Sequence, residues 1–570
     1  MKLQLGNLSA AVDAAVQEAE TNHVVKRIWR KDAALWKDDE PSQRLIRNSL
    51  GWLTVADEMI GVSGDLVEYA EFIRQRGFRQ VMVCGMGGSS LCPEVLRQTF
   101  PLHEGFPELL VLDSTDPDVI AELGEHIDLK HCLFIVSSKS GSTIEPIVFY
   151  KYWYEELSRV TENPGDNVIA ITDPGSPMIE TAAELRFQEV FLNQADIGGR
   201  YSALSYFGLV PAALAGIDIR QLLNHAKEMS QLCSAVMPVK ANPALQLGVV
   251  IAECAKAGRD KLTLVIDQSV ASLGLWIEQL IAESTGKEGK GILPVAGEPL
   301  GDISVYGNDR LFVFISLGPA GKSTEELMET LSSAGHPVVH RQLNDVHELG
   351  SEFFVWEFAT AVAGWRLGIN PFDQPNVQEA KEATIELLNA YTNEKQLPQQ
   401  TELAREDLLT VYVGEEQSEL SSVTAALRVH LDTIKKGDYL ALLSFTEQTP
   451  EIDGILQRIR TIIRTHKGCA TTIGYGPRFL HSTGQLHKGG PSTAVVIQIT
   501  AGDKIDFPVP GEDYSFSVLK QAQAFGDFRA LTRRGRRTLG VSLKDNSVKA
   551  LERLLDLTHE VLTKQSATTV

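Results

Sequence analysis

Short apolar runs alternate with longer amphipathic stretches through most of the chain, and this alternation limits the possible folds more than any other feature. Short runs that are apolar throughout are typical of parallel strands buried on both faces of a sheet. Longer stretches such as MIETAAEL (178–185) have the composition of crossover helices. The alternation therefore predicts a doubly wound α/β fold. The first runs are VMVCG (81–85), LLVLDS (109–114), CLFIVSS (132–138), NVIAITD (167–173) and EVFLN (189–193).

A second series of apolar runs, from KLTLVID (261–267) to TLGVSL (538–543), follows a stretch of helical appearance. We expect two α/β domains of unequal length, at 56–225 and 226–570. Residues 1–55 are expected to form a helical N-terminal arm. The polar, proline-containing segment 392–406 fits a surface connection inside the second domain.

Composition and charge narrow the class of protein. The 570 residues are 43% hydrophobic and 22% charged, which is typical of a globular protein with a large core. The formal net charge of −21 repels polyanions, so we expect no nucleic-acid partner. The one dense basic run, RALTRRGRR (529–537), is interpreted as a solvated turn.

The six cysteines are scattered without a CxxC pair, so neither a disulfide framework nor a zinc site is predicted, and we expect small core residues. The first residues, MKLQLGNLSAAVDAAVQEAE, lack the apolar core of a signal peptide. No apolar run approaches the roughly 20 residues of a spanning helix. We therefore expect a cytoplasmic protein with no membrane partner.

The segment VSSKSGSTIEP (136–146) places hydroxyl side chains between a predicted strand and a predicted helix. The N-terminus of a helix offers free N–H groups and a positive dipole end, and both favour an anion. Hydroxyl donors, a glycine that lets the backbone approach and a nearby lysine complete a loop suited to a phosphate monoester. The alternative is a helix cap with ordinary turn serines. The loop residues are Ser138, Lys139, Ser140, Gly141, Ser142 and Thr143.

A glycine loop, CGMGGSSLCPEV (84–95), also follows a predicted strand and opens a predicted helix. Its glycines resemble the start of a dinucleotide fingerprint, and Asp113 ends the next strand where a ribose-binding acid would stand. Ser90 occupies the sixth position, where the fingerprint has glycine. Nucleotide binding is therefore the second interpretation of this loop.

Motifs in a characteristic order carry a family resemblance. The two loops are followed by GGRYSALSYFGL (198–209), WIEQLIAESTGKEGKG (276–291) and INPFDQPNVQEAKEAT (369–384). Together they resemble the phosphoglucose isomerase family, whose members have two sugar-isomerase (SIS-type) domains. The resemblance implies two doubly wound SIS-type domains and an aldose–ketose isomerase.

The resemblance assigns roles that elementary chemistry supports. Glu283 is expected to move a proton between adjacent carbons through a cis-enediolate, as a carboxylate can do when burial raises its pKa from about 4.3 toward neutrality. Arg200 would stabilise the developing oxygen charge. Gln279 with Glu283, and Gln374 with Lys381, have spacings that share one helix face. The expected substrate-binding residues are Gly88, Ser89, Ser138, Lys139, Ser140, Gly141, Ser142, Thr143, Gln279 and Gln374.

Ring opening is assigned in the family to a lysine and a histidine. Lys381 matches the lysine, but the family's histidine context is absent from 292–368 and appears downstream in RFLHSTGQLHKGG (478–490). We assign ring opening to His481, with His487 as the substitute; a purely structural glycine-rich loop is the alternative. This displaced order resembles the isomerase half of bifunctional transaldolase/phosphoglucose isomerases.

Several functions remain open from the sequence. The first is a cofactor-independent and metal-independent glucose 6-phosphate/fructose 6-phosphate isomerase. SKSGST, Thr285 and the Pro375–Asn376 pair depart from the family pattern, so mannose 6-phosphate is a further candidate substrate. A non-catalytic phosphosugar-binding regulator would need neither Glu283 nor Lys381. An aminotransferase would need an N-terminal glutaminase cysteine, which MKLQLGN does not contain, and a dehydrogenase is disfavoured by Ser90. The family resemblance implies a homodimer.

Overall fold

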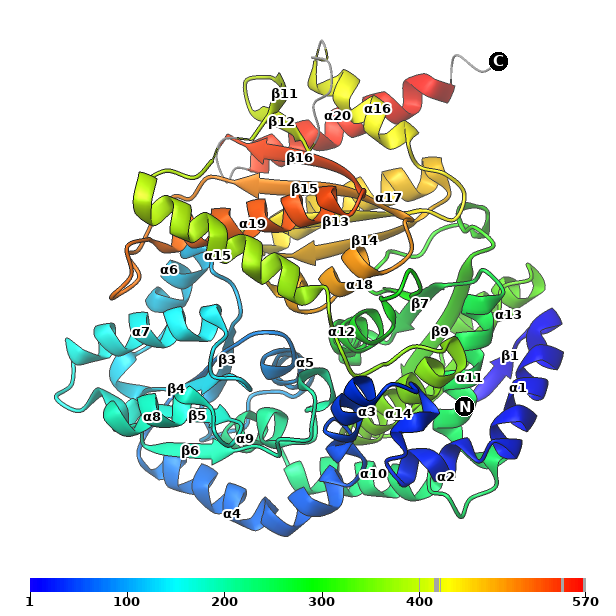
Figure 1. The fold of residues 1–570 in the computed structure, drawn as a ribbon, viewed down its shortest axis with the longest axis horizontal. Helices are drawn as coiled ribbons and strands as arrows, with labels where there is room; N and C mark the ends of the chain where they lie inside the picture. Colours follow the sequence, from blue (N-terminus) through cyan, green and yellow to red (C-terminus); the bar gives the residue numbers. More distant parts are fainter. Residues whose placement is uncertain (399, 415–419, 421, 545–547, 567–570) are drawn as a thin grey trace. The chain divides into compact units, whose positions relative to one another are not determined.

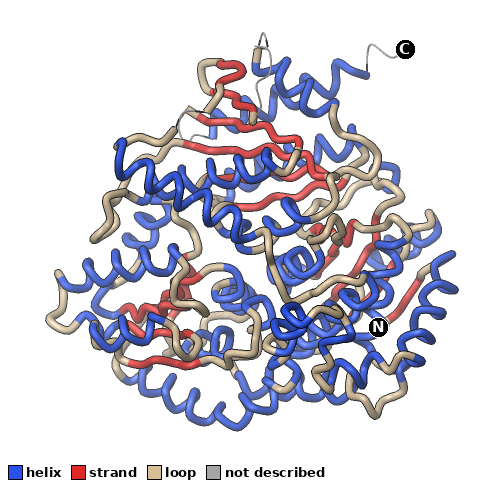
Figure 2. The backbone as a smooth tube through the Cα atoms, viewed as in Figure 1, coloured by secondary structure: helices blue, strands red, loops and turns tan. Residues whose placement is uncertain are grey.

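The computed structural model describes residues 1–398, 400–414, 420, 422–544 and 548–566. The chain forms two compact units. The first comprises Met1–Asp113, His126–Thr285 and Leu311–Asp373, and the second comprises Ser114–Glu125, Gly286–Arg310 and Gln374–Val570. The expected boundaries at 56–225 and 226–570 stay predictions. Most helices and strands are labelled in Figure 1, and Figure 2 separates helices from strands by colour.

A five-stranded parallel sheet forms the first part of the first unit and confirms the strands that the apolar runs predict. Its strand order is β3-β2-β4-β5-β6, so the chain reverses its direction of winding between β2 and β4. In open α/β sheets, ligands bind beyond the carboxyl ends of strands at such a point. The strands are β2 (Gln80–Gly85), β3 (Glu108–Leu112), β4 (Cys132–Ser137), β5 (Val168–Thr172) and β6 (Glu189–Leu192).

Helices connect these strands and pack against them. The 3-10 turn η4 (Gly87–Ser89) leads from β2 into α5, and η7 (Gly199–Tyr201) precedes α9. The helices are α4 (Val55–Gln75), α5 (Leu91–Thr99), α7 (Ile144–Ser158), α8 (Pro177–Glu184) and α9 (Tyr206–Leu214).

The first unit also contains strands from a second sheet, in the order β1-β10-β9-β7. The N-terminal arm is helical from Ser9, but its first residues form an edge strand, β1 (Lys2–Gln4), antiparallel to β10. The other strands are β7 (Lys261–Ile266), β9 (Arg310–Leu317) and β10 (Val338–Leu343). The helices are α1 (Ser9–Thr21), α2 (Val24–Trp29), α3 (Glu40–Arg47), α10 (Ile219–Leu232), α11 (Pro243–Lys256), α12 (Leu273–Thr285), α13 (Lys322–Ser333) and α14 (Leu349–Leu367).

The second unit is built on a six-stranded sheet in the order β11-β12-β16-β15-β13-β14. Four strands are parallel, whereas β12 runs antiparallel to both of its neighbours. The strands are β11 (Glu402–Arg405), β12 (Leu409–Val413), β13 (Tyr439–Phe445), β14 (Ala470–Tyr475), β15 (Ala494–Ala501) and β16 (Arg537–Leu543). The expected connection at 392–406 therefore includes a strand, because β11 pairs with β12.

The second unit contains further elements besides this sheet. The short strand β8 spans Leu293–Val295. The helices are α6 (Pro117–His126), α15 (Val377–Glu394), α16 (Val423–Asp432), α17 (Pro450–Lys467), α18 (Gly484–Gly489), α19 (Phe516–Arg533) and α20 (Val548–Ser566). Apolar side chains of β12, β13, β15 and β16 pack with those of α16, α17 and α20 into one core.

Two expectations from composition can be compared with the fold. All six cysteines are free and buried, as small core residues would be. Among the described residues, no helix combines the length and the apolar character that crossing a bilayer requires.

Candidate active site

The hydroxyl-rich loop lies between β4 and α7, as the sequence predicts. Ser138 is buried, and its Oγ accepts a hydrogen bond from the Gly141 N–H at 3.2 Å. Ser140 Oγ accepts bonds from the Ser142 N–H and hydroxyl at 3.3 and 3.0 Å. Thr143 stands at the N-cap of α7, but its side chain makes no capping hydrogen bond. Thr143 therefore does not cap α7 through its side chain, whereas Ser138 and Ser140 accept backbone hydrogen bonds as turn serines do.

Gly141 is required by the shape of this loop. Its φ of +64° lies in the left-handed region, and a Cβ there would stand 2.0 Å from Ser176 Oγ. Ser176 in turn caps α8, because its Oγ accepts a hydrogen bond from the Met178 N–H. Any larger residue at this position would push the loop away from α8.

Lys139 forms an ion pair that the sequence analysis did not predict. Its ammonium forms an ion pair with Asp173, which follows β5, and lies 3.4 Å from the Ala195 carbonyl oxygen. Burial raises the pKa of the Asp173 carboxyl, although Lys139 opposes that shift. The cation is thus held beside the loop by a carboxylate of the next strand.

The glycine loop after β2 contacts two other predicted segments. Ser137 Oγ donates to the Ser89 carbonyl oxygen at 3.1 Å, which joins the ends of β2 and β4. A Cβ on Gly88 would lie 1.9 Å from the Gly199 carbonyl oxygen, so the glycine lets the two loops touch. This approach explains why the segment GGSS needs glycine without any nucleotide.

Asp113 gives no support to the dinucleotide interpretation. The residue is only 3% exposed, and Ser90 Oγ donates a hydrogen bond to its carboxylate at 3.4 Å. A ribose-binding acid has to reach a ligand at the surface of the sheet. The buried position of Asp113 therefore favours a structural role.

Arg200 and Glu283 meet although they are far apart in the chain. Arg200 Nη1 lies 3.3 Å from Glu283 Oε1, and the two side chains are 3% and 10% exposed. Gln279 Nε2 donates to Glu283 Oε2 at 3.2 Å. Gln279 and Glu283 share one face of α12, as their spacing predicts. The result is a buried carboxylate placed between a guanidinium and an amide.

The guanidinium of Arg200 is held by several further acceptors. Its Nε donates to Ser284 Oγ at 2.7 Å, and Nη2 donates to the carbonyl oxygens of Pro371 and Asp373 at 2.7 and 3.0 Å. These bonds come from α12 and from the segment after α14. A planar guanidinium with this many bonds has one well-defined orientation.

The remaining predicted residues, Gln374, Lys381 and His481, belong to the second unit. Gln374 is exposed, whereas Lys381 and His481 are partly buried. The expectation that Gln374 and Lys381 share a helix face is wrong, because α15 begins at Val377. Pro375 follows Gln374, and a residue before proline is driven away from the helical region.

His487 differs from His481 in its surroundings. It is 1% exposed on α18, and its Nδ1 lies 2.8 Å from the Tyr439 hydroxyl. Burial, helped by the nearby charges of Lys488 and Arg536, lowers the pKa of His487 to about 3. A histidine with such a low pKa is a poor proton donor near neutral pH.

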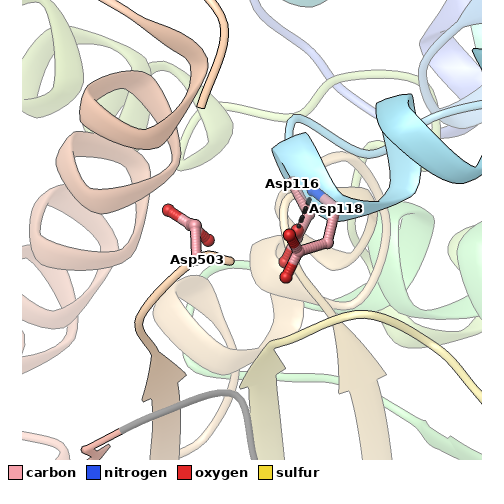
Figure 3. A group of neighbouring side chains, drawn as sticks. All are labelled: Asp116, Asp118 and Asp503. Atoms are coloured by element: carbon pink, nitrogen blue, oxygen red, sulfur yellow. Dashed lines mark hydrogen bonds between the residues drawn. The ribbon is translucent and has the colours of Figure 1, made fainter. Parts of the chain in front are cut away.

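Three acids, Asp116, Asp118 and Asp503, gather in the second unit (Figure 3), with carboxylate oxygens within 4.8 Å of one another. The ammonium of Lys520 lies 3.0 Å from Asp116 Oδ2 and also pairs with Asp503. Asp118 accepts a hydrogen bond from the Lys504 N–H at 3.1 Å. Lys520 thus supplies one positive charge to three carboxylates, and its pairs with Asp116 and Asp503 form an ion-pair network.

Sequence reasoning missed the supporting residues of this site. Ser284 directly follows Glu283 and holds Arg200, and Asp173 holds Lys139. The signal for Asp173 was present, because an acid that ends a buried parallel strand stands at the ligand-binding edge of the sheet. Nothing local marks Pro371 and Asp373, which contribute backbone carbonyls.

The fold and these contacts define a sugar-isomerase (SIS-type) α/β protein. The structure is similar to that of a glucose-6-phosphate isomerase from Chlamydia trachomatis, with a TM-score of 0.53 and 20% sequence identity. The alignment covers 67% of this chain and 87% of that one. This likeness concerns the fold.

The sequence comparisons are more specific. The family model described as phosphoglucose isomerase matches residues 63–293, which include the two loops, Arg200 and Glu283. A probable glucose-6-phosphate isomerase of Methanococcus maripaludis is 27% identical over 61% of this chain and 86% of that protein. A glucose-6-phosphate isomerase of Leptospira interrogans is 27% identical over 61% of this chain and 88% of that protein. Residues 63–293 of the chain thus resemble the phosphoglucose isomerase family, and the chain is an aldose–ketose isomerase.

Proposed function

We propose that the protein interconverts glucose 6-phosphate and fructose 6-phosphate, with Glu283 as the base that transfers a proton through a cis-enediolate. The observation that carries this proposal is the buried Glu283 carboxylate, which lies between Arg200 and Gln279. The names of the Methanococcus and Leptospira relatives support the choice of substrate.

The proton moves between neighbouring carbons on one face of the open sugar. Glu283 removes the proton from C2 of the aldose, and electrons shift to the carbonyl oxygen O1. A proton then passes from the C2 hydroxyl to O1, and the Glu283 acid returns its proton to C1 as the carbonyl forms at C2. Arg200 stabilises the negative charge that develops on oxygen, since a guanidinium in its bonded orientation needs no reorganisation. One carboxylate therefore serves as base and acid.

The phosphate is assigned to the loop Ser138–Thr143. Its hydroxyls are close to the N-terminus of α7, where N–H groups and the helix dipole favour an anion. The absence of a side-chain cap from Thr143 supports this assignment, because the hydroxyl is not used for capping α7.

Ring opening is assigned to His481 with Lys381. The burial of His487, its bond to Tyr439 and its lowered pKa support the choice of His481 over His487. Replacing each histidine separately tests this choice. Loss of turnover should be larger with cyclic glucose 6-phosphate than with open-chain fructose 6-phosphate, and only the ring-opening residue should produce that difference.

We further propose a cytoplasmic homodimer. Light scattering on the purified chain measures the assembly directly. A mass near twice the 62.5 kDa of one chain is expected, and a monomer at working concentration would contradict the proposal.

The decisive experiment compares the wild type with Glu283→Gln in the presence of a chelator. Fructose 6-phosphate is supplied, and glucose 6-phosphate is followed through a coupled NADP-dependent dehydrogenase. Glutamine keeps the shape but cannot take the proton, so kcat should fall by at least about 10²-fold with little change in KM. Glu278→Gln, on the same helix, is the matched control.

The outcomes separate the competing functions. Wild-type turnover that the Glu283 variant retains would refute the base assignment. A folded wild type that binds fructose 6-phosphate without converting it would favour the regulator. If mannose 6-phosphate is the only substrate that is turned over, the substrate assignment is wrong, whereas the proposed proton transfer by Glu283 is unaffected.

A further inference from the structure

A pocket of about 250 Å³ lies in the second unit, and none of the residues assigned above lines it. It is formed by the end of β12, the last turns of α16, the end of α19 and the start of β16. Its walls combine apolar side chains such as Leu403 and Val429 with the polar groups of His430, Arg536 and Thr538. Ligand pockets have this mixture of apolar surface and a few polar groups.

The pocket is at the amino end of the parallel strands. β13 is parallel to β14 and β15, and β15 is parallel to β16, where Arg537 is the first residue. His481 follows the carboxyl end of β14 in the same unit. The pocket and His481 are therefore at opposite edges of one sheet, so the pocket is separate from that part of the proposed site.

Arg536 supplies a buried positive charge whose bonds go to neutral atoms. Its side chain donates to Ser492 Oγ at 2.8 Å and to the carbonyl oxygens of Lys488 and Gly490, both at 2.7 Å. The residue is 8% exposed, and its Nε has no partner among the described residues. The interpretation of 529–537 as a solvated turn is thus wrong for Arg536.

The neighbouring charge of Arg537 is already balanced. Its Nη1 lies 2.6 Å from Asp438 Oδ2 and 2.8 Å from the Thr433 carbonyl oxygen. The two arginines therefore differ: Arg537 is paired with a carboxylate, whereas Arg536, at the wall of the pocket, has no carboxylate partner in the part of the chain that the structure describes. A buried charge of this kind favours an anionic ligand.

His430 adds a second polar group to the pocket, and its role differs from that of Arg536. The ring is 7% exposed and bonds the Val496 backbone, while its Nε2 has no partner within the described part of the chain. Burial, with a smaller effect of Arg537, lowers the pKa of His430 to about 4, so the ring is neutral near pH 7. Because the bond to Val496 raises the pKa, the ring donates it from Nδ1, and Nε2 is left as an acceptor.

We propose that this pocket binds a small hydroxylated phosphate ester, with the phosphate at Arg536 and a hydroxyl donating to His430 Nε2. The volume is below the roughly 300–1,000 Å³ of pockets for drug-sized ligands, so the ligand is a short polyol phosphate. Apolar atoms of Leu403 and Val429 contact its carbon chain. This inference does not depend on the proposed isomerase reaction.

The test uses glycerol 3-phosphate as the probe. Crystals of the full chain are soaked with it, and separate crystals are soaked with inorganic phosphate or with glycerol. We expect density for glycerol 3-phosphate in the pocket, with phosphate oxygens at Arg536 and a hydroxyl at His430. An empty pocket, or an anion only on the exposed Arg533 and Arg534, would overturn the proposal.

Three variants show whether the pocket itself binds the probe. Val429 is 49% exposed, so Val429→Trp fills the mouth with little risk to folding and should abolish the density. Arg536→Gln removes the charge and should also abolish it. Arg533→Gln removes an equal charge from the same segment but outside the pocket, and it should keep the density. Density that persists in Val429→Trp contradicts the proposal even if Arg536→Gln does not fold.

His430→Phe separates the two halves of the recognition. The loss of one hydrogen bond should weaken glycerol 3-phosphate binding in the pocket by about five- to tenfold. Inorganic phosphate should bind as it does in the wild type, because it needs only Arg536. Equal losses for both probes would refute the role of His430 as a hydroxyl acceptor.

Discussion

The substitution Arg200→Lys tests whether the orientation of the guanidinium, and not only its charge, is needed. Lysine keeps the positive charge but offers one nitrogen in place of a planar fork. In the structure the guanidinium contacts the Glu283 carboxylate, Ser284 Oγ and the carbonyl oxygens of Pro371 and Asp373. One ammonium cannot reach acceptors on opposite sides of this group.

The expected magnitudes follow from those contacts. If lysine keeps the pairing with Glu283 and one other bond, about two hydrogen bonds are lost and buried acceptors remain unpaired. Each such loss costs about 1–2 kcal/mol, so unfolding free energy should fall by about 2–4 kcal/mol. Removal of one donor to a developing oxyanion typically lowers kcat by about 10²–10³-fold. Turnover should therefore fall much more than folding alone explains.

The assay combines denaturant unfolding with the coupled measurement of fructose 6-phosphate turnover. Arg159→Lys is the control, because Arg159 is 59% exposed, is the C-cap residue of α7 and pairs with Glu155. That variant should match the wild type in both measurements. If Arg200→Lys keeps kcat within about tenfold of the wild type, the reasoning is refuted and the charge alone is enough.

Two further predictions concern packing and pH. Gly88→Ala places a Cβ 1.9 Å from the Gly199 carbonyl oxygen, so this variant should lower the free energy of unfolding by about 1–3 kcal/mol and reduce turnover. Gly199→Ala should be tolerated, because a Cβ at that position has no atom within 4 Å. Thermal unfolding and turnover of both variants check this, and equal effects would contradict it. In His487→Asn, the free energy of unfolding should fall less than in the wild type as the pH is lowered. The unfolded histidine gains a proton near pH 6.5 while the buried ring, whose pKa is about 3, does not. The contribution of His487 to the free energy of unfolding is therefore fully present above about pH 6.5, and about 2 kcal/mol of it is lost by about pH 5. Denaturant titrations across this range should show the same slope in the wild type and in a variant of the exposed His559, and a smaller slope only in His487→Asn.

The parallel strands and their loops could be predicted because their signals are local. A strand buried on both faces has to be apolar at every position, and the loops that follow β2 and β4 have to be polar and small where a ligand approaches. The pair Gln279 and Glu283 also follows from spacing, since both residues lie within one helix. These features need no knowledge of distant segments.

Other features depend on partners far along the chain. The first residues look like part of a helical arm, yet Lys2–Gln4 pairs with β10 because that sheet edge is available. The segment before Val377 looks helical from spacing, but Pro375 delays the start of α15. His481 and His487 have similar sequence contexts, and only packing buries the second one against Tyr439.

The sequence by itself determined the fold class, the two anion-type loops and the chemical types of the proposed catalytic groups, because periodicity and motif spacing are local properties. Tertiary structure decided that Asp173 pairs with Lys139, that Ser284 orients Arg200, and that Arg536 and His430 share a pocket. These contacts arise when separate elements pack together. Burial and charge compensation, which set the chemistry of each group, exist only after that packing has formed.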